Sequence, residues 1–348
     1  MKTENKLDRN NVENIMTLTD LQQGLLFHYI SNEHSPMYHE QLSLTIKGDL
    51  KLNLLQKSWQ HVIDNNEMLR TVFRWKGIDK PVQIVLKEHK VPINYIDLTE
   101  KLDKYSEIEN IKLNDLNSRI DITRETLRIY LCKLDEYIHE MIVSSHHIIY
   151  DGWSNGVILK ELTEAYNSLY KNENIEKPKK TKFSEFIKYI NNLNKDEERR
   201  YWTDYLRDSD NEKDCFRCKE TGKYKEISYN MDRDKSDKIR NFARENKISL
   251  SSLLYASWGI LLQKLNNSDE VIFGTTVSGR PESINYIDNM VGLFINTIPL
   301  RIKTENNTAF INLIRNVDKV LRGRKDFENT SLIHESSLSI HADRKSVV

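Results

Sequence analysis

The sequence is poor in cysteine, proline and glycine, with three, six and eleven of these residues among 348. Three cysteines are too few for a disulfide framework in a chain of this length. The N-terminal residues 1–6 are polar and lack the apolar core of a secretory signal peptide. We therefore expect a cytoplasmic protein.

Long apolar runs and an excess of charge of one sign are also missing. The most apolar stretches, 253–262 and 290–300, fall short of the ~20 residues that a membrane-spanning helix needs. The 52 basic and 52 acidic side chains cancel, and basic runs such as 177–180 are short. Because binding to nucleic acid depends on clustered Lys and Arg, we expect neither a membrane nor a nucleic acid as partner.

A metal site is not expected either. Cys215 and Cys218 form one CxxC pair, which supplies half of a structural zinc site, and no second CxxC or HxxxH follows. The pair reads as chance spacing in a surface loop.

Two kinds of periodicity alternate along the chain and predict a mixed α/β fold. Apolar residues at helical spacing in 18–29 and 54–63 predict helices, whereas alternation in 41–46 and 82–86 predicts strands. The polar, Lys- and Asn-rich segment 170–182 is typical of a surface connection. We place a domain boundary there, which gives domains 1–175 and 176–348.

The second half is predicted to have a similar order of helices and strands after a polar stretch at 207–225. Its predicted elements are a strand at 227–231, helices at 236–246 and 249–265, a strand at 270–276 and a helix at 310–320.

The most informative segment follows a predicted strand at 139–145. It reads His146, His147, three further residues, Asp151 and Gly152, before a helix expected to start at Ser154. Neighbouring side chains of a strand point to opposite faces, so one histidine is expected to be chemical and the other structural. Imidazole titrates near neutrality and suits proton transfer, and a nearby carboxylate can orient the ring or anchor the loop.

These residues by themselves leave the chemistry open. Two adjacent histidines in a strand are more often packed and hydrogen-bonded than catalytic. The pair also lacks the i, i+4 spacing on a helix that binds zinc in metalloproteases.

Residues 146–152 resemble the HHxxxDG signature of nonribosomal peptide synthetase condensation domains. The shorter form HxxxDG is typical of the wider superfamily of chloramphenicol acetyltransferase-like acyltransferases. Further segments resemble condensation-domain motifs in the same order along the chain. These are the opening helix motif at 18–28, RHExLRTxF at 66–73, YWxxxL at 201–206, GxxxSGRP at 273–281 and VGxFxNTxPxR at 291–301.

The resemblance implies two chloramphenicol acetyltransferase-like lobes, each a mixed sheet with flanking helices, which form a V around a central tunnel. It implies amide bond formation between a donor aminoacyl or peptidyl thioester and an acceptor aminoacyl thioester. Both would arrive on peptidyl carrier proteins, whose phosphopantetheine arms enter the tunnel, and an adjacent adenylation domain is a further expected partner. The chain itself is expected to bind no cofactor.

The resemblance also assigns roles to residues of the signature. It places the catalytic candidates at His147, His146, Asp151 and Gly152, and it implies that His147 assists attack of the acceptor amine. Asp151 is implied to form a structural salt bridge with an arginine, for which Arg70 is the candidate. The backbone N–H of Gly152 is implied to approach the reacting centre in an oxyanion-type role.

Other motif residues divide into core and site. Trp153, Ser154, Arg280 and Asn296 are expected to line the tunnel or the contact between the lobes. Apolar motif residues are expected in the core, namely Leu69, Val72, Phe73, Trp202, Phe294 and Ile298.

Two departures from the family pattern stand out. Asn65 and Asn66 replace the Arg-His pair of the second motif. After the predicted helix at 310–320 the chain runs through 331–333 and ends at Val348, and 341–348 match no expected motif. We therefore expect a C-terminally truncated chain whose second lobe is incomplete and exposes a sheet edge.

Alternative functions stay open at this point. One is an acyltransferase of the same superfamily that uses soluble coenzyme A, and an epimerisation domain is a further relative. Another is a non-catalytic truncated remnant or carrier-docking module that keeps the fold without the chemistry.

Overall fold

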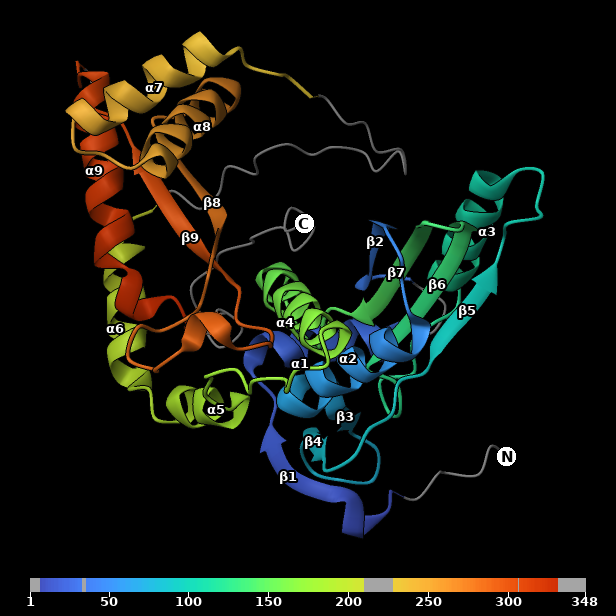
Figure 1. The fold of residues 1–348 in the computed structure, drawn as a ribbon. Helices are drawn as coiled ribbons and strands as arrows, with labels where there is room; N and C mark the ends of the chain where they lie inside the picture. The colour runs from blue at the N-terminus through green and yellow to red at the C-terminus, as the bar shows by residue number, and fades with distance from the viewer. Residues whose placement is uncertain (1–6, 33–35, 210–227, 306, 331–348) are drawn as a thin grey trace. The chain divides into compact units, whose positions relative to one another are not determined.

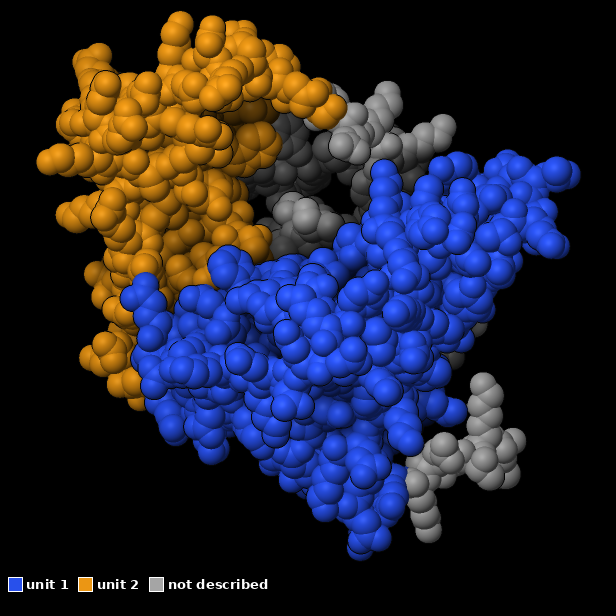
Figure 2. Space-filling view, viewed as in Figure 1, with its two compact units in different colours: residues 1–193, 280–295 blue, residues 194–279, 296–348 orange. Residues whose placement is uncertain are grey.

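The computed structural model describes residues 7–32, 36–209, 228–305 and 307–330. Cys215, Cys218 and the segments 331–333 and 341–348 lie outside the described residues. The chain groups into two compact units, coloured separately in Figure 2. Unit 1 comprises Met1–Leu193 and Arg280–Ile295, and unit 2 comprises Asn194–Gly279 and Asn296–Val348.

This grouping differs from the expected domains in two segments. Residues 176–193 and 280–295 belong to unit 1, although both lie beyond the expected boundary. The chain therefore passes from unit 2 into unit 1 at residue 280 and returns to unit 2 at residue 296. The division into two lobes around a tunnel stays a prediction, as does the incompleteness of the second lobe.

Unit 1 contains two sheets and five helices among the described residues. Its strands are β1 (Val12–Thr17), β2 (His39–Lys47), β3 (Thr71–Arg74), β4 (Val82–Leu86), β5 (Ile93–Asp97), β6 (Leu127–Asp135) and β7 (Ile138–His146). Its helices are α1 (Asp20–Ser31), α2 (Leu52–Asn65), α3 (Lys104–Asn117), α4 (Gly152–Tyr170) and α5 (Phe183–Asn191), with short 3₁₀ turns η2 (Glu67–Arg70) and η3 (Ile287–Asn289). Figure 1 shows their arrangement.

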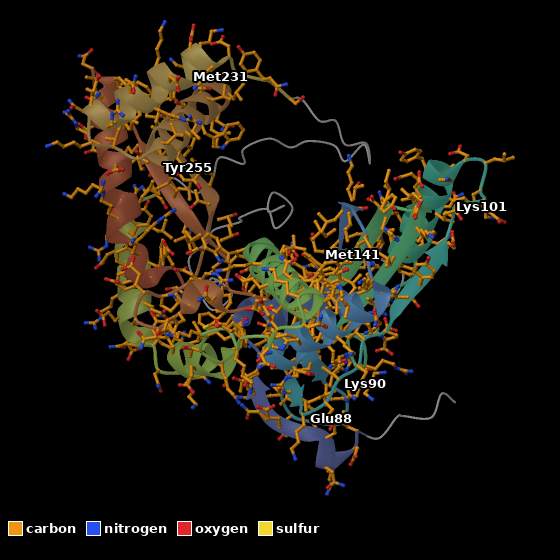
Figure 3. All side chains as sticks on the ribbon, viewed as in Figure 1. Glu88, Lys90, Lys101, Met141, Met231 and Tyr255 are labelled. Atoms are coloured by element: carbon orange, nitrogen blue, oxygen red, sulfur yellow. The ribbon has the colours of Figure 1, made fainter. Side chains whose placement is uncertain are left out.

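The larger sheet of unit 1 has the strand order β2-β7-β6-β5. Strand β7 pairs with β2 and β6 in antiparallel fashion, and β5 adds to β6 in parallel. Because β7 has a partner on both sides, its backbone hydrogen bonds are satisfied along its length, and its residues from Met141, labelled in Figure 3, to His146 are all buried. The signature segment therefore begins at the end of a rigid inner strand.

Helices α2 and α4 pack on each other and build the core of unit 1. The apolar face of α2 buries Trp59, Val62 and Ile63 completely, and α4 contributes Ile158 and Leu162. Burial of a large apolar side chain stabilises the fold by roughly 1.5–3 kcal/mol. The smaller sheet has the order β1-β4-β3.

The described part of unit 2 consists of helices on a two-stranded antiparallel sheet. Its elements are α6 (Lys195–Tyr205), α7 (Arg233–Glu245), α8 (Leu250–Asn266), β8 (Glu270–Val277), β9 (Asn296–Lys303), α9 (Phe310–Gly323) and the 3₁₀ turn η4 (Lys325–Phe327). Trp202 of α6 packs with Val277 and Ile298 in one cluster, and α8 and α9 close a second. None of the described helices is both long and apolar enough to cross a membrane.

Most of the predicted elements are confirmed, with small shifts at their ends. Ser249 caps α8 as expected, its hydroxyl accepting the N–H of Ser252. Helix α4 starts at Gly152 rather than Ser154, because Asp151 is its N-cap and accepts the N–H of Ser154. The strand predicted at 227–231 is wrong for its described residues 228–231, which adopt no regular structure.

The glycines of α4 and α8 provide a matched test of packing. A Cβ at Gly156 would meet no atom within 4 Å, whereas a Cβ at Gly259 would lie 2.5 Å from Cδ1 of Ile302. Gly156→Ala should therefore raise the free energy of unfolding by about 0.5–1 kcal/mol through helix propensity. Gly259→Ala should lower it by about 1–3 kcal/mol through overpacking. Urea unfolding of both variants measures the difference, and equal shifts of one sign would contradict the packing described for α8.

Candidate active site

The signature residues lie at a junction where β7 runs through a turn into α4. The N–H of Ile149 donates to the carbonyl of His146 at 3.0 Å, which closes the turn directly after the strand. Two positions later Asp151 caps the helix. Side chains on such a junction are held by regular elements on both sides.

His147 is fixed at both its backbone and its ring. Its N–H donates to the carbonyl of Tyr38 at 2.8 Å, and its ring Nδ1 lies 2.8 Å from the carbonyl of Tyr150. A carbonyl only accepts, so Nδ1 carries a proton, and in the neutral ring Nε2 holds the lone pair. The side chain is half-buried, and Nε2 has no hydrogen-bond partner within the described ranges. His147 can therefore accept a proton from a group that approaches Nε2.

His146 has the opposite character. Its ring is buried, meets the ring of Tyr29 edge-on at 5.3 Å, and its Nδ1 accepts the N–H of Ile148 at 3.1 Å. Burial lowers the pKa of His146 to about 3, so the ring is neutral at physiological pH. Of the two neighbouring histidines, this one serves packing.

Asp151 anchors the junction. One carboxylate oxygen accepts the N–H groups of Phe294 and Ile295 at 3.0 and 3.3 Å. The other accepts the N–H and hydroxyl of Ser154 at 3.2 and 3.0 Å and lies 3.3 Å from Nη2 of Arg280. The carboxylate is fully buried, so these five donors offset the cost of removing its charge from water.

The arginine that pairs with Asp151 is Arg280, and the expectation of Arg70 is wrong. Arg280 also donates to the carbonyls of Ile287 and Met290 at 2.6 and 2.9 Å. Its guanidinium lies 4.0 Å from the centre of the Phe294 ring. The two residues lie 129 positions apart in the sequence, so local sequence patterns could not indicate that they pair.

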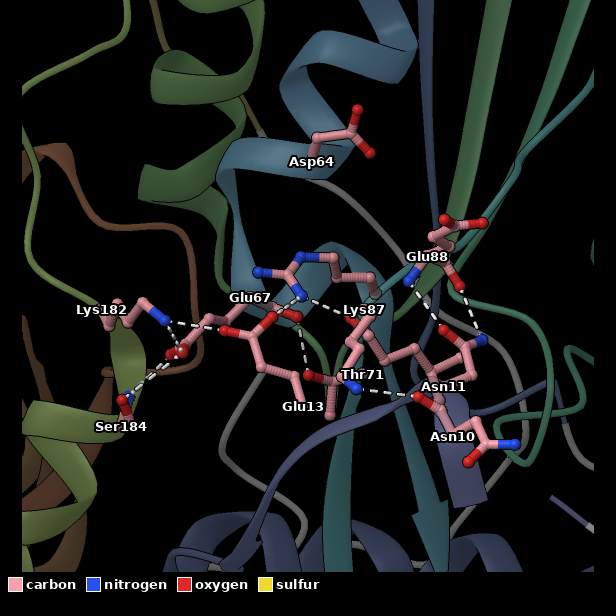
Figure 4. A network of polar contacts seen from close by, with 12 residues as sticks. Asn10, Asn11, Glu13, Asp64, Glu67, Thr71, Lys87, Glu88, Lys182 and Ser184 are labelled. Carbon is pink, nitrogen blue, oxygen red and sulfur yellow. Dashed lines mark hydrogen bonds and ion pairs between the residues drawn. The ribbon is translucent and has the colours of Figure 1, made fainter. Parts of the chain in front are cut away.

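Arg70 belongs to a different network. It pairs with Glu13, which is labelled in Figure 4, and donates to the carbonyl of Leu86. Glu13 also accepts Lys182 at 2.7 Å, and Glu67 accepts the N–H of Ser184 at 2.9 Å. These bonds tie β1 and η2 to the start of α5, and Asp151 takes part in none of them.

Asn66, one of the two residues that replace the usual Arg-His pair, forms hydrogen bonds with two charged side chains. Its amide N–H donates to Glu161 at 2.8 Å, and its oxygen accepts Lys180 at 2.7 Å. Lys180 and Glu161 pair directly. Burial lowers the pKa of Lys180, against the opposing effect of Glu161. Glu13, Glu161 and Lys180 lie outside every motif, and sequence reasoning did not identify them.

The remaining predicted site residues are dispersed. The structure buries Ser154 and Arg280 within unit 1, where both bind Asp151. Trp153 is 56% exposed and donates to the carbonyl of Asp288 at 3.1 Å. Asn296, in unit 2, donates to the carbonyls of Glu328 and Thr330, each at 2.9 Å. Tunnel roles for Trp153 and Asn296 stay predictions.

Gly152 is the first residue of α4 and is exposed. A Cβ at this position would meet no atom within 4 Å. The N–H groups at a helix N-terminus carry partial positive charge and favour a developing anion. The oxyanion role of Gly152 stays a prediction.

The fold and this junction define the chain as a mixed α/β protein of the condensation-domain type. A solved structure of the first condensation domain of the calcium-dependent antibiotic synthetase, in complex with a substrate analogue, superimposes with a TM-score of 0.74. The match covers 94% of this chain and 78% of that chain at 16% identity. The starter condensation domain of rhizomide synthetase RzmA matches at a TM-score of 0.74, with 91% of this chain covered.

The sequence then identifies the family: the chain belongs to the condensation domains, whose family model matches residues 12–348. Tyrocidine synthase 3 of Brevibacillus parabrevis is 35% identical over 89% of this chain, and bacitracin synthase 1 of Bacillus licheniformis is 32% identical over 92%. The chain spans only 5% and 6% of the length of these relatives. The match includes 341–348, in which no family motif was expected.

The assignment of Arg280 can be tested with a double-mutant cycle. Asp151→Ala should lower the free energy of unfolding by roughly 3–5 kcal/mol, because the buried guanidinium loses its charged partner. Adding Arg280→Met should cost less than the sum of the two single changes, with a coupling of about 0.5–3 kcal/mol in urea unfolding. Arg70→Met provides the control: it shares no partner with Asp151, so its effect should add. Coupling to Arg70 and none to Arg280 would contradict the pairing described here.

The buried ring of His146 predicts a pH dependence of stability. Between its folded pKa of about 3 and its ordinary value near 6.5, the unfolded chain binds a proton at this position and the folded chain does not. The free energy of unfolding should therefore fall as the pH is lowered through this range. His146→Asn retains an acceptor for Ile148 but does not titrate, so its urea midpoint should fall less steeply between pH 6.5 and about 4. An identical slope in both proteins would show that His146 is not the group responsible.

Proposed function

We propose that the chain forms an amide bond between a donor aminoacyl or peptidyl thioester and an acceptor aminoacyl thioester. The observation that carries this proposal is the state of His147, whose Nδ1–H is bound by a carbonyl while Nε2 is left as an acceptor. Membership of the condensation-domain family supplies the substrate class.

The chemistry requires one proton to move while two bonds change. The acceptor enters as a neutral amine, and its nitrogen attacks the carbonyl carbon of the donor thioester. As the C–N bond forms, Nε2 of His147 accepts a hydrogen bond, and then the proton, from this nitrogen. The C–S bond breaks next, and the proton leaves with the thiolate as a free thiol. In this proposal the N–H groups at the start of α4, at Gly152, stabilise the oxyanion of the intermediate.

The substrates are proposed to arrive on two peptidyl carrier proteins, each through a phosphopantetheine arm in a tunnel between the two lobes. An adjacent adenylation domain would load the acceptor carrier. The curated relatives are peptide synthetases of far greater length, which supports an assembly of this kind.

The direct test is dipeptide formation from two loaded carrier proteins. His147→Ala should reduce kcat by about 10²–10⁴-fold, the usual contribution of a positioned acid or base. His61→Ala is the matched control, because His61 is a half-buried histidine on α2 whose side chain bonds only to Asn65 in the part of the chain described. The control should keep the wild-type rate.

The result also separates the alternatives. Undiminished dipeptide formation by His147→Ala would refute the proposed role of the ring. Binding of loaded carriers without turnover by the wild-type chain would identify a carrier-docking module instead. Acyl transfer from coenzyme A thioesters at a higher rate than from carriers would point to a coenzyme A-dependent acyltransferase.

A further inference from the structure

Tyr38 faces His147 across the end of the larger sheet of unit 1. The register of β2 and β7 pairs His39 with His146, so the next position outward pairs Tyr38 with His147. The Tyr38 carbonyl accepts the N–H of His147 at 2.8 Å. A return bond from the Tyr38 N–H to His147 is not found among the described residues. Beyond the paired strands β2 and β7, Tyr38 and His147 are therefore joined by one backbone hydrogen bond instead of two.

The backbone of Tyr38 explains this one-sided bond. Tyr38 has a φ of 65°, in the left-handed backbone region that residues other than glycine, asparagine and aspartate rarely adopt. A left-handed residue redirects the chain, so its carbonyl and its N–H do not both face the neighbouring strand. The N–H of His39 donates to the carbonyl of Pro36 at 3.0 Å, which closes a turn around Tyr38.

Neighbouring rings pack around the side chain of Tyr38. The ring of His28, from α1, lies 5.9 Å away, and the ring of His146 lies 6.3 Å away. Backbone conformations of this kind persist where the surrounding structure holds them, and they concentrate at functional sites. One of these two rings belongs to His146, the residue that directly precedes His147.

We propose that Tyr38 is a positioning residue for His147. Its left-handed backbone presents the carbonyl that fixes the main chain of His147, while the Tyr150 carbonyl fixes the ring. Together the two carbonyls determine the direction in which Nε2 points. The inference rests on the proposed function of His147 and extends it to a residue outside every sequence motif.

Substitutions that differ in their tolerance of the left-handed conformation test this proposal. Tyr38→Gly, Tyr38→Asn, Tyr38→Ala and Tyr38→Val all remove the ring and keep the carbonyl, so they differ mainly in backbone preference. In the dipeptide assay kcat should fall in that order, with valine about tenfold below glycine. KM should change by less than about twofold, because the substrate contacts themselves are not altered.

A second readout needs no substrate. The amide of His147 should be protected from hydrogen exchange by its bond to Tyr38, and protection should decrease across the same four variants. This order would support the inference even if the wild-type chain formed no dipeptide. Failure of the catalytic proposal and failure of this one are thereby distinguishable.

Lys247→Val controls for backbone strain in general. Lys247 also has a positive φ, of 55°, and lies in unit 2. This variant should lose thermal stability without a change in kcat or in the protection of the His147 amide. If Tyr38→Val does not fold, the Gly and Ala variants decide, since they differ by one methyl group.

Two outcomes would overturn the proposal. One is equal amide protection and equal kcat in all four variants at wild-type level, which would show that the backbone conformation at position 38 is irrelevant. The other is an equal loss in all four, which would assign the effect to the missing ring.

Discussion

The site depends on one buried carboxylate. Asp151 accepts hydrogen bonds from the first turn of α4, from two backbone N–H groups at 294–295 and from Arg280. Its own N–H donates to the carbonyl of Gly292 at 3.1 Å. A segment inserted between β8 and β9 is thus bonded to the turn that presents His147, although the two lie more than 100 residues apart in sequence. Such a charge is stable away from water only when its oxygens are bonded, so the parts of this arrangement require one another.

The inserted segment must also come close to the rest of unit 1. A Cβ at Gly292 would lie 2.4 Å from the Phe183 ring, closer than real Cβ contacts allow. Only glycine lets this backbone approach Phe183 while its carbonyl accepts the N–H of Asp151. Close packing against Phe183 therefore explains why the glycine position of the VGxFxNT motif requires glycine in this chain. The adjacent Phe294 contributes its ring to the core and its N–H to Asp151.

The sequence predicted well what depends on local periodicity and on ordered motifs. Helices α1, α2, α8 and α9 and strands β2, β4, β7 and β8 follow from their apolar spacing, and the core positions Leu69, Phe73, Trp202 and Phe294 are buried as expected. Strands β1 and β5 gave no clear signal, because apolar and polar residues do not alternate regularly in the sequence of 12–17 or 93–97. The partner of Asp151 could not be found in this way, since Arg70 and Arg280 both stand in motifs and only the fold decides which one is near.

The two histidines of the signature are neighbours in sequence but differ in burial and in hydrogen bonding. Both carry the same side chain, but His146 ends a strand that is covered on both sides, and desolvation keeps it uncharged. His147 stands one residue further, where the ladder is bonded on one side only and the ring is half-buried. The bond from its Nδ1 to Tyr150 leaves Nε2 as the acceptor in the neutral state. The same strand end thus holds one histidine that is buried and neutral and, next to it, one whose Nε2 is left as an acceptor.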